Sequence, residues 1–203
     1  MKNLKEMNDF RNVQPQRRPS PRHVSKYRLY KEDLRQDFKK CCGYCGDEEC
    51  WGGGKRVFHI DHFVPRKILV NISEESYNNL VYSCFYCNNK KRADWPTGNE
   101  NVHNDGIKGY IDPCDPTYGQ QFMRNDLGEI IPLTPLGNYM YSRLGLSLRR
   151  HPLIWNLCRL EKRIVKLKEL HKIGKLNENT KEFLEVLIEY TEYIEELKNE
   201  QSK

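Results

Sequence analysis

Apolar side chains recur at three- and four-residue steps in three stretches of the chain, a spacing typical of helices with one buried face. The first stretch predicts an amphipathic helix that begins near Lys26 and carries Tyr27, Tyr30, Leu34 and Phe38. The other two stretches contain Leu153, Leu157, Leu160, Ile164, Leu167 and Leu170, followed by Phe183, Leu187, Tyr190, Ile194 and Leu197. They predict two long helices near the C-terminal end.

The two C-terminal stripes are separated by Gly174, and Asn179 with Glu182 has the spacing of a capping box at the start of the second helix. We therefore expect an αα-hairpin over residues 152–203. The stripes resemble a coiled-coil seam but continue for little more than two heptads. Packing of the two helices on each other is the simpler interpretation, and an interface for a partner protein is the alternative.

Shorter elements are expected between these helices. Residues 57–60 and 79–83 are β-prone runs, and residues 84–92 can form a short helix that Trp95-Pro96 would stop. Residues 26–100 should form the core, and residues 101–151, rich in Gly, Asn, Asp and Pro, a wrapping extension without clear elements. Residues 1–25, with three prolines and no periodicity, read as a flexible arm. The expected fold class is α+β.

Charge is unevenly distributed along the 203 residues. Residues 1–30 hold eight basic and two acidic side chains, a net charge of +6, whereas residues 175–203 carry a net charge of −4. Because cationic contacts raise the affinity for phosphates, the basic end favours an approach to nucleic acid. The alternative is that the basic arm only keeps the protein in solution.

The eight cysteines indicate metal binding more than disulfides. The N-terminal residues lack the apolar stretch of a signal peptide, and paired CxxC spacing is typical of a reducing compartment, so we expect a cytoplasmic protein. No apolar run approaches the roughly 20 residues needed to cross a bilayer, so no membrane span is expected. With 37% apolar residues the core should be small, which favours a metal as a structural link.

Two CxxC pairs, Cys42/Cys45 and Cys84/Cys87, predict a structural zinc site, because four thiolates complete a tetrahedron and leave no open position. The 38 residues between the pairs exceed the usual zinc-ribbon gap of about 15–20, which is expected if a functional hairpin lies between them. Two thiol pairs without a metal are the alternative.

The enclosed segment contains a second kind of metal-compatible set. Asp61, His62 and Asn88 offer oxygen and nitrogen donors that suit a harder, exchangeable ion. Adjacent residues of a regular strand point to opposite faces, so Asp61 and His62 can share one site only if the strand bends or ends there, which Pro65 allows. For His59 we favour a packing or hydrogen-bonding role.

Three segments in order, His59-Ile-Asp61-His62-Phe-Val-Pro65, then Asn79-Leu80, then Cys84-Phe-Tyr-Cys87-Asn88-Asn-Lys90, resemble the HNH endonuclease family. The resemblance covers roughly residues 38–95 and implies a zinc-stapled ββα-metal fold. It also implies His62 as general base, Asp61 and Asn88 as ligands of a catalytic Mg²⁺ or Mn²⁺ ion, and Asn79 as the residue that steadies the His62 loop. Asn88 stands where the family often has His, an HNN variant that resembles the HNH domain of RNA-guided CRISPR nucleases.

The implied activity is metal-dependent hydrolysis of DNA phosphodiester bonds, leaving 5′-phosphate and 3′-hydroxyl ends. Because an ordinary histidine titrates near pH 6.5, activity should fall below about that pH. Flanking phosphates could contact Lys90, Lys91 and Arg92, although a solvated basic helix end explains these residues as well.

Residues 108–150 also resemble the tail of bacterial nucleases of anti-phage defence type, some of which work with a partner ATPase. This resemblance implies an antiviral effector, with a protein partner expected on the C-terminal hairpin. The alternative function is a noncatalytic zinc-stabilised nucleic-acid-binding or adaptor protein, in which the HNN variation marks lost activity.

Overall fold

The computed structural model describes residues 9–172 and 180–202, and the chain divides into two compact units. Unit 1 comprises Met1–Asp126 and Ile130–Ser147, and unit 2 comprises Leu127–Glu129 and Leu148–Lys203.

Unit 1 begins its regular structure with the 3₁₀ turn η1, Tyr27–Tyr30, and the helix α1, Lys31–Asp37. The apolar stripe expected from the sequence supplies the buried residues Tyr30, Leu34 and Phe38. The predicted helix is confirmed, although its first turn is 3₁₀ rather than α.

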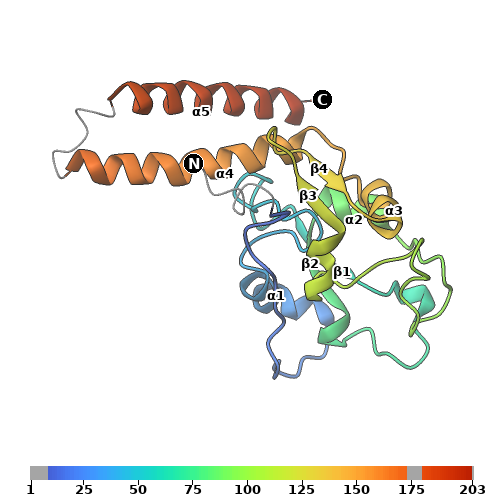
Figure 1. The fold of residues 1–203 in the computed structure, drawn as a ribbon. Coiled ribbons are helices and arrows are strands. Elements are labelled where there is room, and N and C mark those ends of the chain that lie inside the picture. The colour runs from blue at the N-terminus through green and yellow to red at the C-terminus, as the bar shows by residue number, and fades with distance from the viewer. Residues whose placement is uncertain (1–8, 173–179, 203) are drawn as a thin grey trace. The chain divides into compact units, whose positions relative to one another are not determined.

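The centre of unit 1 is a two-stranded antiparallel sheet followed directly by a helix. Strand β1, Phe58–His62, pairs with β2, Leu80–Cys84, so that Asp61 lies opposite Val81 and His62 opposite Leu80. The 3₁₀ turns η2, Arg66–Ile68, and η3, Tyr77–Asn79, lie in the connection. Helix α2, Phe85–Lys91, begins without an intervening loop and packs on both strands (Figure 1).

Helix α2 ends at Lys91, one residue before the end predicted at residue 92. The residue after it, Arg92, has φ 49°, a left-handed value that is strained for a side chain with a Cβ. Its backbone N–H still donates to the carbonyl of Asn88, so the last turn of the helix closes on Arg92. The sequence has no glycine at this point, so the residue types do not predict this left-handed turn.

The expected wrapping extension contains regular elements. These are the 3₁₀ helix η4, Pro116–Gln121, the paired strands β3, Phe122–Arg124, and β4, Ile130–Pro132, and the helix α3, Pro135–Leu144. Helix α3 has an N-cap, because the Thr134 hydroxyl accepts the N–H of Gly137, and it ends at Gly145 with φ 68°. These two signals were present in the sequence.

Residues 9–25 differ from the flexible arm expected from composition. Phe10 is only 3% exposed, and its ring centroid lies 4.8 Å from that of Phe122. The Arg11 guanidinium donates to the carbonyls of Gly43 and Pro113 at 2.9 and 2.6 Å. Other arginines of this segment pair with carboxylates, so much of its positive charge is neutralised within unit 1.

Unit 2 is a helical hairpin of α4, Arg150–Lys172, and α5, Thr180–Gln201. The two helices lie side by side (Figure 1) and bury Leu160, Ile164, Leu167 and Val186 between them. This confirms the predicted packing of the two stripes, whereas Gly174 and Asn179 lie outside the described residues.

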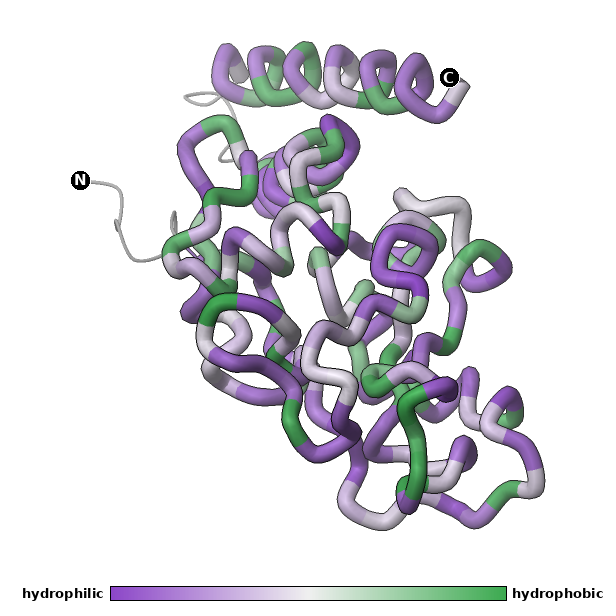
Figure 2. The backbone as a smooth tube through the Cα atoms, turned by 90° about the vertical axis from the view of Figure 1, so that its right-hand side faces the viewer, coloured by the Kyte–Doolittle hydropathy of each residue, from purple (hydrophilic) through white to green (hydrophobic). Residues whose placement is uncertain are grey.

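Polar and apolar residues are interspersed along the helices of unit 2 (Figure 2). Among the described helices, none combines the length and the apolar content that crossing a bilayer requires.

Candidate active site and metal centre

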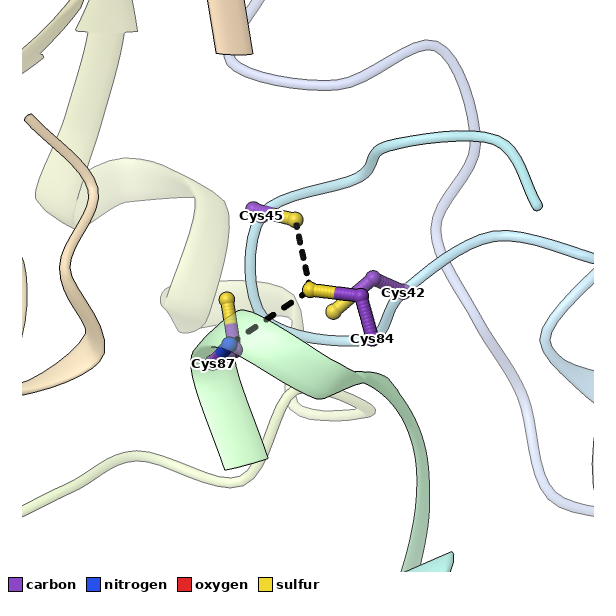
Figure 3. Close-up of side chains that lie close together, drawn as sticks. All are labelled: Cys42, Cys45, Cys84 and Cys87. Carbon is purple, nitrogen blue, oxygen red and sulfur yellow. Dashed lines mark hydrogen bonds between the residues drawn. The ribbon is translucent and has the colours of Figure 1, made fainter. Parts of the chain in front are cut away.

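The four predicted zinc ligands, Cys42, Cys45, Cys84 and Cys87, converge in unit 1 (Figure 3). All four are buried, and their sulfur atoms lie within 4.8 Å of one another. The first pair lies in the loop after α1, and the second pair lies at the junction of β2 and α2. The cluster therefore links the loop after α1 to the junction of β2 and α2.

The sulfur geometry fits a tetrahedral zinc ion. The Cys45 and Cys84 Sγ atoms are 3.9 Å apart, close to the roughly 3.8 Å between ligands of a tetrahedron with 2.3 Å Zn–S bonds. That distance is too long for a disulfide of about 2.05 Å. The Cys87 N–H also donates to the Cys84 sulfur at 3.5 Å, which favours a thiolate (Figure 3). The positions of the four sulfur atoms therefore fit a zinc site.

A hollow of about 350 Å³ opens where β1 ends against α2. Its lining includes Tyr27, Asp61, His62, Arg66, Asn88 and Arg92, and we call it the His62 hollow. Asp61 and His62 are adjacent in sequence and both line it, because β1 ends at His62 and the regular alternation of side chains ends with the strand. The three residues predicted to share a site are therefore brought together.

One ring nitrogen of His62 is fixed by the backbone. Nε2 lies 3.0 Å from the carbonyl oxygen of Glu74, and a carbonyl can only accept, so Nε2 carries the hydrogen. In the neutral imidazole Nδ1 is then the proton acceptor. Burial lowers the pKa of His62 below its ordinary value, opposed by the Glu74 hydrogen bond and by the charge of Asp61. The Tyr27 ring meets the imidazole edge-on, with centroids 4.6 Å apart.

The Asp61 carboxylate is held at one oxygen. Oδ2 accepts a hydrogen bond of 2.5 Å from the Tyr44 hydroxyl and lies 2.9 Å from the Lys91 ammonium. Within the described residues, Oδ1 has no hydrogen-bond donor, so one oxygen is left for a ligand. The Asn88 side-chain amide likewise has no partner in that part of the chain. These oxygens suit a hard divalent cation.

The Asn79 side chain binds the segment that follows His62. Its Oδ1 accepts the N–H of Val64 at 2.8 Å, and its Nδ2 donates to the carbonyl of Val64 at 3.0 Å. Its own carbonyl accepts the N–H of Phe63 at 2.8 Å. Asn79 thereby fixes the backbone directly after His62 at three points.

Of the three basic residues predicted to contact phosphates, the structure exposes Lys90 and Arg92 but buries Lys91 completely. Lys91 Nζ also donates to the carbonyl of His62 at 2.9 Å, so this ammonium lies inside the core and not on a phosphate-binding surface. Lys91 follows Cys87 by four residues and therefore shares the inward face of α2.

His59, two residues before Asp61, is exposed and does not line the His62 hollow. Its ring lies beside Phe85, with centroids 6.0 Å apart, in agreement with a packing role.

The sequence did not identify Tyr44, Glu74 or Tyr27 as parts of the site. The first acts through its hydroxyl, the second through a backbone carbonyl, and the third through ring packing. A backbone carbonyl leaves no signal in the residue type, and a tyrosine within a CxxC pair has no fixed role. For Lys91, in contrast, the four-residue spacing after the buried Cys87 was a sequence feature that could have predicted its burial.

Residues 42–94 match the family model described as HNH endonuclease. Comparison with curated proteins and with solved structures gives no match. The matched segment contains all four cysteines together with Asp61, His62, Asn79 and Asn88. The chain therefore carries an HNH endonuclease domain at residues 42–94 with a zinc-compatible cysteine cluster, which suggests a nuclease of the HNH family.

Proposed function

We propose that this chain is a metal-dependent endonuclease that hydrolyses phosphodiester bonds of DNA, with β1, β2 and α2 as its ββα-metal core. The observation that carries the proposal is the state of His62. Its Nε2 lies 3.0 Å from the Glu74 carbonyl oxygen, which leaves Nδ1 as the base, and the His62 side chain lines a hollow that Asp61 and Asn88 also line.

His62 acts as the general base in this proposal. Nδ1 takes a proton from the attacking water, and the Nε2–H of the resulting imidazolium still donates to the Glu74 carbonyl. Burial lowers the pKa of His62, so the imidazole is neutral and ready to accept a proton at neutral pH. Asn79 contributes by fixing the backbone after His62.

The Asp61 Oδ1 atom and the Asn88 amide oxygen would hold a Mg²⁺ or Mn²⁺ ion. When bound, such an ion neutralises charge on phosphoryl oxygens and on the departing oxygen. Arg92 lines the same hollow and is exposed, so it can contact a flanking phosphate, and Lys90 lies two residues before it.

Lys91 favours one alternative function. Its ammonium already neutralises the Asp61 carboxylate and thereby opposes a second cation at this position. In the alternative, the domain is a noncatalytic zinc-stabilised adaptor that binds nucleic acid and holds no divalent ion at Asp61.

A role in anti-phage defence and a protein partner on the helical hairpin belong to the proposal as well. The first is supported by the resemblance of residues 108–150, and the second by the exposed apolar residues Val165, Leu184 and Ile188 on the helices of unit 2.

Supercoiled plasmid incubated with the full chain and Mg²⁺ tests the proposal. We expect nicked and then linear DNA with 5′-phosphate and 3′-hydroxyl ends, and no cleavage in EDTA. DNA binding without cleavage in Mg²⁺ or Mn²⁺, with zinc as the sole bound metal, would support the adaptor and contradict the nuclease.

A further inference from the structure

A second hollow, of about 720 Å³, adjoins the His62 hollow in unit 1. The two share Lys67, Arg92 and Ala93 in their linings, so these residues form the border between them. The second hollow extends from α2 to Arg143 on α3, and we call it the Arg143 hollow. Helix α3 lies outside residues 42–94, the segment that matches the HNH family.

Four exposed cations, Lys67, Lys90, Arg92 and Arg143, line the Arg143 hollow. Within the described residues the first three have no carboxylate partner, in contrast to the paired arginines of residues 9–25. Cations that lie close together without carboxylate partners repel one another, and a bound polyanion removes that repulsion.

The lining also contains the carboxylate of Asp94, which already has hydrogen-bond partners within unit 1. Its Oδ2 accepts from the hydroxyls of Tyr110 and Tyr139 at 2.7 and 2.6 Å, and the Arg143 Nε atom lies 3.7 Å away. The Arg143 side chain is still 55% exposed, so its loose pairing leaves it able to contact a phosphate.

The backbone at the junction is strained. Arg92 lines both hollows and has φ 49°, a left-handed backbone conformation that a residue with a Cβ rarely adopts. Such strain is concentrated at functional sites, where it directs a side chain that an unstrained backbone would turn elsewhere.

We propose that the Arg143 hollow binds the DNA strand as it leaves the cleavage site, with Lys67 and Arg143 each contacting a backbone phosphate. The path runs from His62 past Arg92 to α3, so the substrate is held partly by an element outside the family segment. This inference rests on the proposed nuclease function, because the DNA strand is the substrate of the His62 hollow. Contacts to phosphates fix register and carry no base specificity.

Equilibrium binding of a short fluorescent DNA duplex to the full chain, measured across salt concentrations, tests this proposal. All variants carry His62→Ala, so that cleavage does not enter the measurement. Arg143→Ala and Lys67→Ala should each weaken binding and reduce the slope of log K against log salt by about 0.9, the value for one lost phosphate contact. Arg56→Ala, an exposed arginine that lines neither hollow, is the matched control and should leave the slope unchanged.

Arg143→Lys keeps the charge and should restore the slope, which separates a phosphate contact from an effect on folding. The proposal is overturned if Arg143→Ala and Lys67→Ala behave like Arg56→Ala while the parent chain cleaves plasmid, a result that leaves the nuclease function intact. Absence of DNA binding by every variant, together with absence of cleavage by the parent chain, would overturn both proposals.

Discussion

The Lys91 ammonium lies 2.9 Å from the Asp61 carboxylate, and the two side chains are 0% and 8% exposed. A buried ion pair of this kind contributes little net stability, but removal of one partner leaves the other charge uncompensated. The pair therefore holds Asp61 in place beside His62, and it makes the core dependent on Lys91.

We expect Lys91→Met to lower the free energy of unfolding by about 3–5 kcal/mol, because the Asp61 carboxylate would remain buried with the Tyr44 hydroxyl as its one donor among residues 9–172 and 180–202. Urea unfolding of the full chain measures this change. Lys90→Met, at the exposed neighbour, should stay within about 0.5 kcal/mol of the parent. Equal effects of the two substitutions would show that the pair is not buried as described.

The four-cysteine cluster predicts one zinc ion per chain. Cys84→Ala should lose the zinc and the cooperative unfolding transition, because the ligand joins β2 to α2 and metal binding is coupled to folding. Cys50→Ala, at an exposed cysteine outside the cluster, should retain both. Metal analysis of the purified chains decides the question, and a Cys84→Ala chain with full zinc content would refute the ligand assignment.

Asn79 binds both polar groups of the Val64 backbone. We expect Asn79→Ala to cost about 1–3 kcal/mol of stability, because the buried N–H of Val64 loses its acceptor. We also expect a fall in kcat larger than any change in KM, since the segment directly after His62 would lose its support. Asn78→Ala, at the exposed neighbour, is the control for both measurements. Unchanged kcat in Asn79→Ala would remove the positioning role.

Glu100 predicts a pH dependence of stability. Its carboxylate accepts the backbone N–H of Val70, then those of Asn71 and Ile72, and these hydrogen bonds lower its pKa from 4.5 to about 2. A lowered pKa in the folded state gives stability that is complete above pH 4.5 and lost as the pH falls towards 2.

Glu100→Gln should therefore be less stable than the parent at pH 7, with a difference that shrinks as the pH falls below 4.5. Thermal unfolding at a series of pH values measures this. The control is Glu75→Gln, because the Glu75 carboxylate accepts from the Ser73 hydroxyl and not from a row of backbone N–H groups. A difference for Glu100→Gln that is independent of pH would contradict the account.

Patterns of residue type were sufficient to predict the elements that carry the site. The helix before Cys42, the two strands, the short helix after Cys84 and the hairpin all follow from periodicity or from CxxC spacing. Asp61, His62 and Asn88 could be grouped because a motif connects them along the sequence.

Other features depend on contacts between residues far apart in sequence. Arg17 pairs with Asp112 at 2.8 Å, which no local pattern predicts, so the first residues read as a flexible arm. The fixed tautomer of His62 depends on a backbone carbonyl twelve residues away. Helix α3 was missed although Thr134 and Gly145 mark its ends, because the surrounding glycines and prolines concealed them.

The most direct test of the central claim compares plasmid cleavage by His62→Ala and His59→Ala in Mg²⁺. The two histidines lie on the same strand, but only His62 lines the hollow with Asp61 and Asn88. We predict that His62→Ala abolishes cleavage while its zinc content and unfolding transition stay intact, and that His59→Ala cleaves like the parent chain. Cleavage by His62→Ala at the parental rate would contradict the assignment of His62 as the base.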